Sequence, residues 1–243
     1  MQKIGVFDSG VGGLSILNEL LKELPYEDFY YYGDSLNNPY GEKSDEELLK
    51  ITSNIVEKLI NKNCKLIVIA CNTATTRCMK KLREIYSNVI FVGTVPAIKV
   101  ACDKRFKNTL VMATPATIES ERTYELIRDN KRYDQNIYLL PCPGLANAIE
   151  QNDKEKIKRI LQNDFKDYKD KEIDAIVLGC THYPFIREEI LEEMPNTILI
   201  DGSIGVSKEV KRQLEEHGLL NDERVRKIEI YNSLTEKLET IVE

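Results

Sequence analysis

Short apolar runs alternate with helical stretches along most of the chain, and this alternation constrains the fold more than any other feature. The apolar runs lack a strict apolar–polar alternation, which is typical of strands buried on both faces of a parallel sheet. We expect strands at Lys3–Phe7, Phe29–Tyr32, Leu66–Ala70, Ile90–Val92, Thr109–Ala113, Ile137–Leu140, Ala175–Leu178 and Thr197–Ile200, with a weaker one at Ile228–Tyr231. Helical patterns lie between them, for example at Ser44–Ile60, Ala116–Arg128, Glu155–Phe165 and Ser207–Glu216. The sequence therefore predicts an α/β fold with parallel sheets covered by helices.

Two of the expected strands lead into similar segments. Each ends in a cysteine followed by small polar residues: Leu66–Ala70 before Cys71-Asn72-Thr73, and Ala175–Gly179 before Cys180-Thr181-His182. Ligands of open α/β sheets bind beyond the carboxyl ends of the strands. We therefore expect two similar domains, residues 1–94 plus 206–243 and residues 95–205, with the active site in the cleft between them.

Charge and hydropathy exclude several classes of partner. The net charge is −6, and lysines alternate with acids, so no basic stripe for nucleic acid is visible. No apolar run approaches the ~18–20 residues of a membrane span. The chain enters a strand pattern at its first residues, which gives no sign of a signal peptide. We expect a cytoplasmic protein without nucleic-acid or membrane partners.

The cysteine pattern does not favour a metal site. The six cysteines, at positions 64, 71, 78, 102, 142 and 180, form no C-x-x-C pair, and the only histidines are His182 and His217. Free thiols are the default in a reducing cytosol, and most of these are expected to be small core residues. No lysine motif for a Schiff base is evident. We expect no cofactor and no metal.

Cys71 and Cys180 are the best candidates for chemistry. Each is expected at the end of a strand and before a helix, where the partial positive charge of the helix N-terminus favours a thiolate. His182 adjoins Cys180, and a neutral imidazole can accept a thiol proton. A buried structural cysteine is the ordinary alternative for each, and we expect His217 to lie on the surface.

A glycine-rich turn, Asp8-Ser9-Gly10-Val11-Gly12-Gly13, follows the first strand. It is neither a G-x-G-x-x-G fingerprint nor a P-loop, and Asp8 would repel a phosphate. A carboxylate beside a thiol can accept or orient its proton. Helix capping by Asp8 and Ser9 is an equally open interpretation.

Two further segments could bind an anion. The Tyr40 hydroxyl and the Gly41 amide could cap a ligand carboxylate, or Pro39-Tyr40-Gly41 could be an ordinary turn. Thr114 and Thr117 open a helix, where their hydroxyls could bind an anion or simply cap.

Taken together, these motifs resemble the glutamate racemase family. The resemblance rests on Asp8-Ser9-Gly10-Val11-Gly12-Gly13-Leu14, Pro39-Tyr40-Gly41, Cys71-Asn72-Thr73-Ala74-Thr75, Val95-Pro96-Ala97-Ile98-Lys99 and Gly179-Cys180-Thr181-His182-Tyr183-Pro184. They run in the family's order and spacing from residue 4 to about residue 202. The Cys-Thr-His-Tyr-Pro segment favours glutamate over the aspartate and hydantoin racemases of the wider superfamily.

The resemblance implies a cofactor-independent, two-base reaction that supplies D-glutamate for peptidoglycan. By this resemblance, Cys180 would act on L-glutamate with the help of His182, and Cys71 would act on D-glutamate with the help of Asp8. Glu150 matches a further acid of the family's site. The substrate's ammonium and carboxylates would be held by Asp8, Ser9, Tyr40, Gly41, Asn72, Thr73, Thr117, Thr181 and His182. Family members often form homodimers.

The chain departs from the family pattern at the edge of the expected pocket. Ala116 stands at a usual glycine, Lys43 replaces a usual arginine, and Cys142–Glu150 lacks a valine–proline pair. These departures concern the substrate preference. Alternatives are a racemase for aspartate or another amino acid, a binding protein without turnover, and a cysteine hydrolase with one nucleophilic thiol.

Overall fold

The structure is a computed structural model that describes residues 2–222 and 225–242. It divides into two compact units, Met1–Thr94 with Ser203–Glu243, and Val95–Gly202. The division expected after residue 205 lies inside the helix Ser203–Glu216, which belongs wholly to the first unit.

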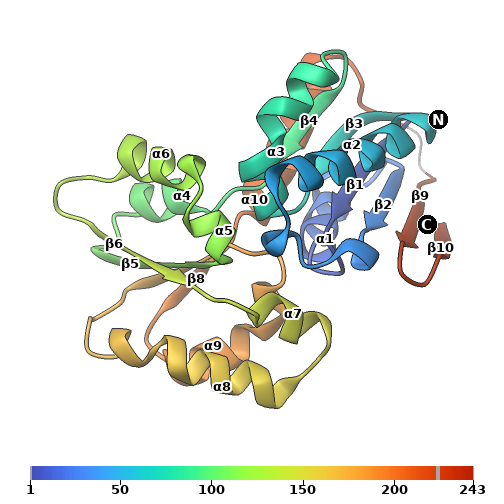
Figure 1. The fold of residues 1–243 in the computed structure, drawn as a ribbon. Coiled ribbons are helices and arrows are strands. Elements are labelled where there is room, and N and C mark those ends of the chain that lie inside the picture. The colour runs from blue at the N-terminus through green and yellow to red at the C-terminus, as the bar shows by residue number, and fades with distance from the viewer. Residues whose placement is uncertain (1, 223–224, 243) are drawn as a thin grey trace. The chain divides into compact units, whose positions relative to one another are not determined.

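The first unit is built on a six-stranded sheet in the order β10-β9-β2-β1-β3-β4. Its strands are β1 (Lys3–Asp8), β2 (Phe29–Gly33), β3 (Cys64–Ile69), β4 (Ile90–Gly93), β9 (Lys227–Asn232) and β10 (Lys237–Val242). All neighbours pair in parallel except β9 and β10, which form an antiparallel hairpin at the sheet edge (Figure 1). The carboxyl ends of β9, β2, β1 and β3 therefore lie side by side.

Helices cover both faces of this sheet. They are α1 (Leu14–Glu23), α2 (Asp45–Asn61), α3 (Asn72–Ile85) and α10 (Ser203–Glu216), with 3₁₀ turns at Ser35–Asn37 and Tyr40–Glu42. The apolar sides of α1 and α10 pack on one face through Leu17, Leu20 and Val210. α2 and α3 cover the other face through Val56 and Leu82. Burial of both faces explains the continuous apolar strands.

The second unit has a four-stranded parallel sheet in the order β6-β5-β7-β8. Its strands are β5 (Asn108–Ala113), β6 (Asn136–Pro141), β7 (Ala175–Leu178) and β8 (Ile198–Ile200). Its helices are α4 (Ile98–Asp103), α5 (Pro115–Ile118), α6 (Glu121–Asn130), α7 (Leu145–Glu150), α8 (Lys154–Asp164) and α9 (Arg187–Glu193), with 3₁₀ turns at Lys166–Tyr168 and Tyr183–Ile186. α4, α5 and α6 cover one face, and α7, α8 and α9 cover the other (Figure 1).

The predicted α/β class with parallel sheets between helices is confirmed, and each expected strand is present. The single helix expected over Ala116–Arg128 is wrong. Ser120 adopts an extended backbone (φ −68°, ψ 141°), and its hydroxyl accepts a hydrogen bond from the Thr123 amide, so it ends α5 and caps a new helix, α6. Along the described residues, no helix combines the length and the apolar character that a bilayer span requires.

Candidate active site

Cys71 lies at the carboxyl end of β3 and forms the N-cap of α3. It is 6% exposed, and its carbonyl accepts a hydrogen bond from the Thr75 amide at 2.9 Å. Its Sγ lies 3.9 Å from the Oγ of Ser9, which follows the adjacent strand β1. The thiol therefore lies at the N-terminus of a 14-residue helix, whose dipole favours negative charge, and its ionisation stays a prediction.

Asp8 is fully buried at the end of β1, and its Oδ2 organises the glycine-rich turn. That oxygen accepts hydrogen bonds from the amides of Gly10 at 3.1 Å and Gly13 at 3.0 Å. A Cβ on Gly13 would lie 2.6 Å from the Asp8 Cβ, so glycine is required for this close approach. Asp8 therefore holds the turn before α1, whereas the N-cap of that helix is Gly13 and has no side-chain cap, so helix capping by Asp8 or Ser9 is not observed. Assistance of Asp8 to Cys71 stays a prediction.

Asn72 and Thr73 begin α3 and are both buried. Among the described residues, Asn72 Oδ1 has no hydrogen-bond partner although it is shielded from solvent. A buried acceptor without a donor costs about 1–3 kcal/mol. Such an atom, on the residue that follows Cys71, is suited to a ligand's N–H group.

Tyr40 and Gly41 lie in the 3₁₀ turn that follows β2. Tyr40 is 2% exposed, and its hydroxyl donates to Asp34 Oδ2 at 2.8 Å. Because a phenol has a single O–H, this proton is used inside the protein rather than offered to a ligand carboxylate. The Tyr40 oxygen remains an acceptor, and ligand binding by Tyr40 and Gly41 stays a prediction.

Cys180 lies two residues beyond β7, as Cys71 lies two residues beyond β3, but its surroundings differ. Its Sγ is 3.8 Å from His182 Nδ1, and His182 Nε2 is 2.6 Å from Glu150 Oε2 at the end of α7. His182 is 1% exposed. Sequence reasoning reached Glu150 only through the family resemblance, and the structure brings it into contact with the histidine.

Thr117 and Thr181 are also buried in the second unit. The Thr114 hydroxyl donates to Thr117 Oγ1 at 3.0 Å and accepts from the Thr117 amide at 3.3 Å, so the capping interpretation holds for this turn. Thr181 separates Cys180 from His182. Their contacts with a substrate remain predictions.

Comparisons with known proteins identify the family of the chain. The sequence model of the Asp/Glu/Hydantoin racemase family matches residues 30–207. Glutamate racemase from Clostridium acetobutylicum is 47% identical over 235 residues, which cover 95% of this chain and 91% of that protein. The chain belongs to the glutamate racemase family.

Solved structures of this family have the same fold. Glutamate racemase from Francisella tularensis in complex with D-glutamate superposes with a TM-score of 0.83 at 33% identity, covering 96% of this chain and 88% of that one. The Escherichia coli enzyme in complex with L-glutamate and the activator UDP-MurNAc-ala gives 0.79 at 32%, covering 88% and 83%. The chain is thus a racemase, an isomerase of the Asp/Glu racemase family.

Sequence reasoning missed Asp34, which lies beside the predicted site residues of this racemase. Asp34 directly follows β2, the neighbour of β1, and its amide donates to the Asp8 carbonyl at 2.9 Å. It is 1% exposed and accepts from the Tyr40 hydroxyl. An acid near the end of a buried parallel strand was the available signal, because Asp8 ends β1 and Asp34 comes one residue after Gly33, the pairing partner of Asp8.

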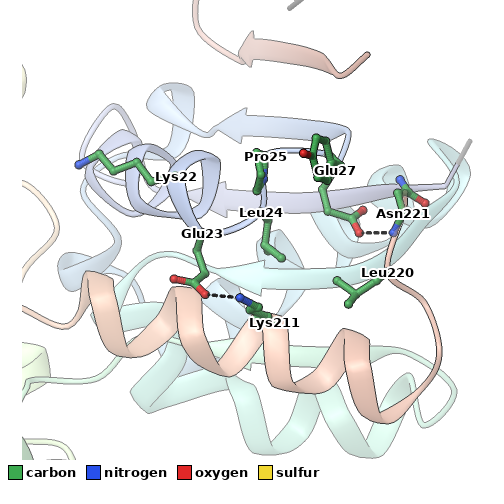
Figure 2. Close-up of a pocket in the computed structure, with 9 residues that line it drawn as sticks. Lys22, Glu23, Leu24, Pro25, Glu27, Lys211, Leu220 and Asn221 are labelled. Atoms are coloured by element: carbon green, nitrogen blue, oxygen red, sulfur yellow. Dashed lines mark hydrogen bonds and ion pairs between the residues drawn. The ribbon is translucent and has the colours of Figure 1, made fainter. Parts of the chain in front are cut away.

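A hollow of about 500 Å³ in the first unit lies away from these residues (Figure 2). Its lining comes from the end of α1, the chain between α1 and β2, the helix α10 and the chain after it. It comprises Lys22, Glu23, Leu24, Pro25, Tyr26, Glu27, Lys211, Leu220 and Asn221. Residues before β2 mark the amino-terminal edge of the sheet, whereas Asp8 and Cys71 lie at its carboxyl edge. No predicted site residue lines this hollow.

Proposed function

We propose that this chain interconverts L-glutamate and D-glutamate with Cys71 and Cys180 as its two bases. The observation that carries the proposal is the pair of cysteines two residues beyond β3 and β7, each with its own supporting groups, in a chain of the glutamate racemase family. Racemisation needs a base on one face of the α-carbon and an acid on the other. Two independently supported thiols meet that need.

From L-glutamate, the Cys180 thiolate takes the α-proton and becomes a thiol. The Cys71 thiol returns its own proton to the opposite face and becomes a thiolate. From D-glutamate the roles exchange, so no atom or electron is gained or lost. The α-proton beside a carboxylate is very weakly acidic, and enzymes commonly lower such barriers by ~8–23 kcal/mol. Fixed donors in a water-excluding site are the means available.

His182 and Glu150 prepare Cys180. The carboxylate 2.6 Å from Nε2 holds a proton on that nitrogen, which leaves the Nδ1 lone pair of the neutral ring facing Cys180. The imidazole can then accept the thiol proton, and the imidazolium stabilises the thiolate. In the first unit, the N-terminus of α3 and the carboxylate of Asp8 support Cys71.

Asn72 Oδ1, without a donor in the described protein, is suited to the substrate's ammonium group. The relatives from Francisella tularensis and Escherichia coli were solved with D-glutamate and L-glutamate respectively. Both enantiomers are therefore ligands in this family, which supports glutamate as the substrate here.

The proposed role is the supply of D-glutamate for peptidoglycan in the cytoplasm. A homodimer without a bound cofactor is the expected form of the enzyme. Light scattering tests the dimer, and retention of activity after treatment with a chelator or hydroxylamine tests cofactor independence.

The deciding experiment runs the reaction in heavy water from pure L-glutamate, with products separated by chiral chromatography and analysed by mass spectrometry. The D-product should carry α-deuterium from the first turnovers, while the remaining L-substrate stays largely unlabelled. D-Glutamate should give the mirror result, and L-aspartate serves as the control substrate. Retention of the original proton in the product would indicate one base, and absence of racemisation would overturn the proposed activity.

A further inference from the structure

Four neighbouring strands of the first unit place polar residues at one edge of the sheet. At their carboxyl ends, β9, β2 and β3 lead into Ser233, Asp34 and Cys71, and β1 ends at Asp8. The backbone links them: the Asp34 amide donates to the Asp8 carbonyl at 2.9 Å, and the Ser233 amide donates to the Gly33 carbonyl at 2.9 Å. The C-terminal hairpin, β9 with β10, thus adjoins the proposed Cys71 half of the site through Asp34.

Asp34 is the centre of this arrangement. Its Oδ1 accepts from the Ser233 hydroxyl at 2.9 Å, and its Oδ2 accepts from the Tyr40 hydroxyl at 2.8 Å. Asn37 Nδ2 lies 3.0 Å from both carboxylate oxygens. Three neutral donors converge on a carboxylate that is 1% exposed. A buried acceptor of this kind holds its donors in place, because losing any of them leaves it undersatisfied.

Tyr40 is fixed by this contact. Burial, together with the charge of Asp34, raises the pKa of the Tyr40 hydroxyl well above its ordinary value. The hydroxyl therefore stays protonated and keeps donating to Asp34. On the other side of the turn, Arg77 Nη2 donates to the Lys43 carbonyl at 2.8 Å. The segment 34–43, which we term the substrate loop, is held at both of its ends.

Ser233 brings the C-terminal hairpin into the same network. Its hydroxyl donates to Asp34 and accepts from the Leu36 amide at 3.0 Å. The neighbouring Asn232 Nδ2 donates to the Ser35 hydroxyl at 3.0 Å. Ser233 thus contacts the carboxylate of Asp34 although the two residues are 199 positions apart in the sequence. The hairpin therefore contacts the substrate loop through the side chains of Asn232 and Ser233, and it is held beside the loop by the pairing of β9 with β2.

We propose that Asp34 and Ser233 are positioning residues that hold Tyr40 and Gly41 in the orientation that binds the substrate. The inference rests on the proposed glutamate racemase function. Because the Asp34–Asp8 bond is a backbone bond, it survives side-chain substitution at Asp34. Substitutions should therefore weaken binding more than they slow proton transfer, raising KM with a smaller change in kcat.

The test measures kcat and KM for both enantiomers in Asp34→Asn, Ser233→Ala and Tyr40→Phe. The asparagine would keep the size of the side chain but present an NH₂ group to donors, and KM should rise about tenfold or more, as expected for a lost hydrogen bond to a charged group. Ser233→Ala should raise KM roughly threefold. Thr235→Ala, at an exposed residue of the same hairpin, is the matched control and should match the wild type.

A double-mutant cycle separates positioning from general destabilisation. If Ser233 acts through Asp34 on Tyr40, then Ser233→Ala in the Tyr40→Phe background should change KM less than it does alone. Additive effects, unchanged KM, or a fall in kcat alone would overturn the inference. Should Asp34→Asn unfold, the Ser233 and Tyr40 cycle decides the question. A wild-type protein that does not racemise glutamate would overturn the proposed function instead, so the two failures are distinguishable.

Discussion

The surroundings of Cys71 and Cys180 differ although both cysteines stand two residues beyond a central parallel strand. Cys71 caps the regular helix α3, and the nearby carboxylate of Asp8 is bound by backbone amides. Cys180 is followed by a 3₁₀ turn of four residues and contacts a side-chain pair, His182 with Glu150. Cys71 thus lies at a helix N-terminus near a carboxylate that backbone amides hold, whereas Cys180 contacts a pair of titratable side chains.

This difference predicts which substitutions should affect the half-site around Cys71 and which should affect the half-site around Cys180. Backbone support depends on glycines that permit close approach, such as Gly13 beside Asp8. Side-chain support depends on a histidine that can exchange a proton. The proposed reaction nevertheless uses both thiols in each direction. Substitutions of neighbouring residues should therefore affect activity differently in the two half-sites, whereas loss of either sulfur should abolish it.

The largest expected effect is the loss of either sulfur. Cys71→Ala and Cys180→Ala should each lower racemisation by at least ~10³-fold in both directions, since each direction needs a base and an acid. Circular dichroism at a fixed wavelength follows the reaction from either enantiomer. Cys78→Ala in the first unit and Cys102→Ala in the second are controls, because both thiols are buried inside helices, α3 and α4, rather than at strand ends. Near wild-type activity in either test variant would show that the pair is wrongly named.

The next largest effect compares one side chain in contact with each sulfur. His182 Nδ1 lies 3.8 Å from Cys180, and Ser9 Oγ lies 3.9 Å from Cys71. An imidazole can accept a proton near neutral pH, whereas an alcohol cannot, so His182→Asn should lower kcat by ~10²–10⁴-fold and Ser9→Ala by less than about tenfold. Equal losses in steady-state assays would contradict the division between side-chain and backbone support.

The fold was largely predictable from the sequence because parallel strands buried on both faces are continuous apolar runs. The hairpin strand β10 escaped prediction because it lies at the sheet edge, with all six of its residues exposed. The break between α5 and α6 was missed because it depends on Ser120 acting as a cap, and a serine inside a helical pattern carries no unique signal.

The candidate site was only partly predictable. Cys71, Cys180, Asp8 and His182 lie at or just beyond strand ends, so local pattern was enough to select them. Glu150 lies 32 residues before His182, and no pattern in the sequence indicates their 2.6 Å contact. Asp34 was overlooked because its role depends on Ser233, which reaches it through the pairing of β9 with β2.

Matched glycine substitutions should test the geometry of each half-site. In Gly13→Ala the new Cβ would lie 2.6 Å from the Asp8 Cβ, and in Gly179→Ala it would lie 2.9 Å from the Met112 carbonyl oxygen. Each should destabilise the protein by about 1–3 kcal/mol, measured by urea unfolding. Gly205→Ala is the control, since nothing lies within 4 Å of its Cβ position. Wild-type stability at Gly13 would contradict the tight turn described around Asp8.

The smallest expected effect on catalysis concerns a thiol outside both half-sites. Burial raises the pKa of Cys64 to about 12, whereas an unfolded thiol titrates near ~8.5. The folded state therefore disfavours the thiolate, and the stabilising difference is present below ~8.5 and is lost as pH rises toward about 12. Cys64→Ala should leave racemisation nearly unchanged. Between about pH 7 and pH 10, the free energy of unfolding of this variant should fall less than that of the wild type.

Alkylation tests the same thiol. Mass spectrometry after brief iodoacetamide treatment at about pH 8 should find Cys64 unmodified while activity is lost, with glutamate protecting the enzyme. Early labelling of Cys64 would mean that this thiol is not held protonated, and inactivation that tracks Cys64 rather than Cys71 or Cys180 would break the assignment of both half-sites.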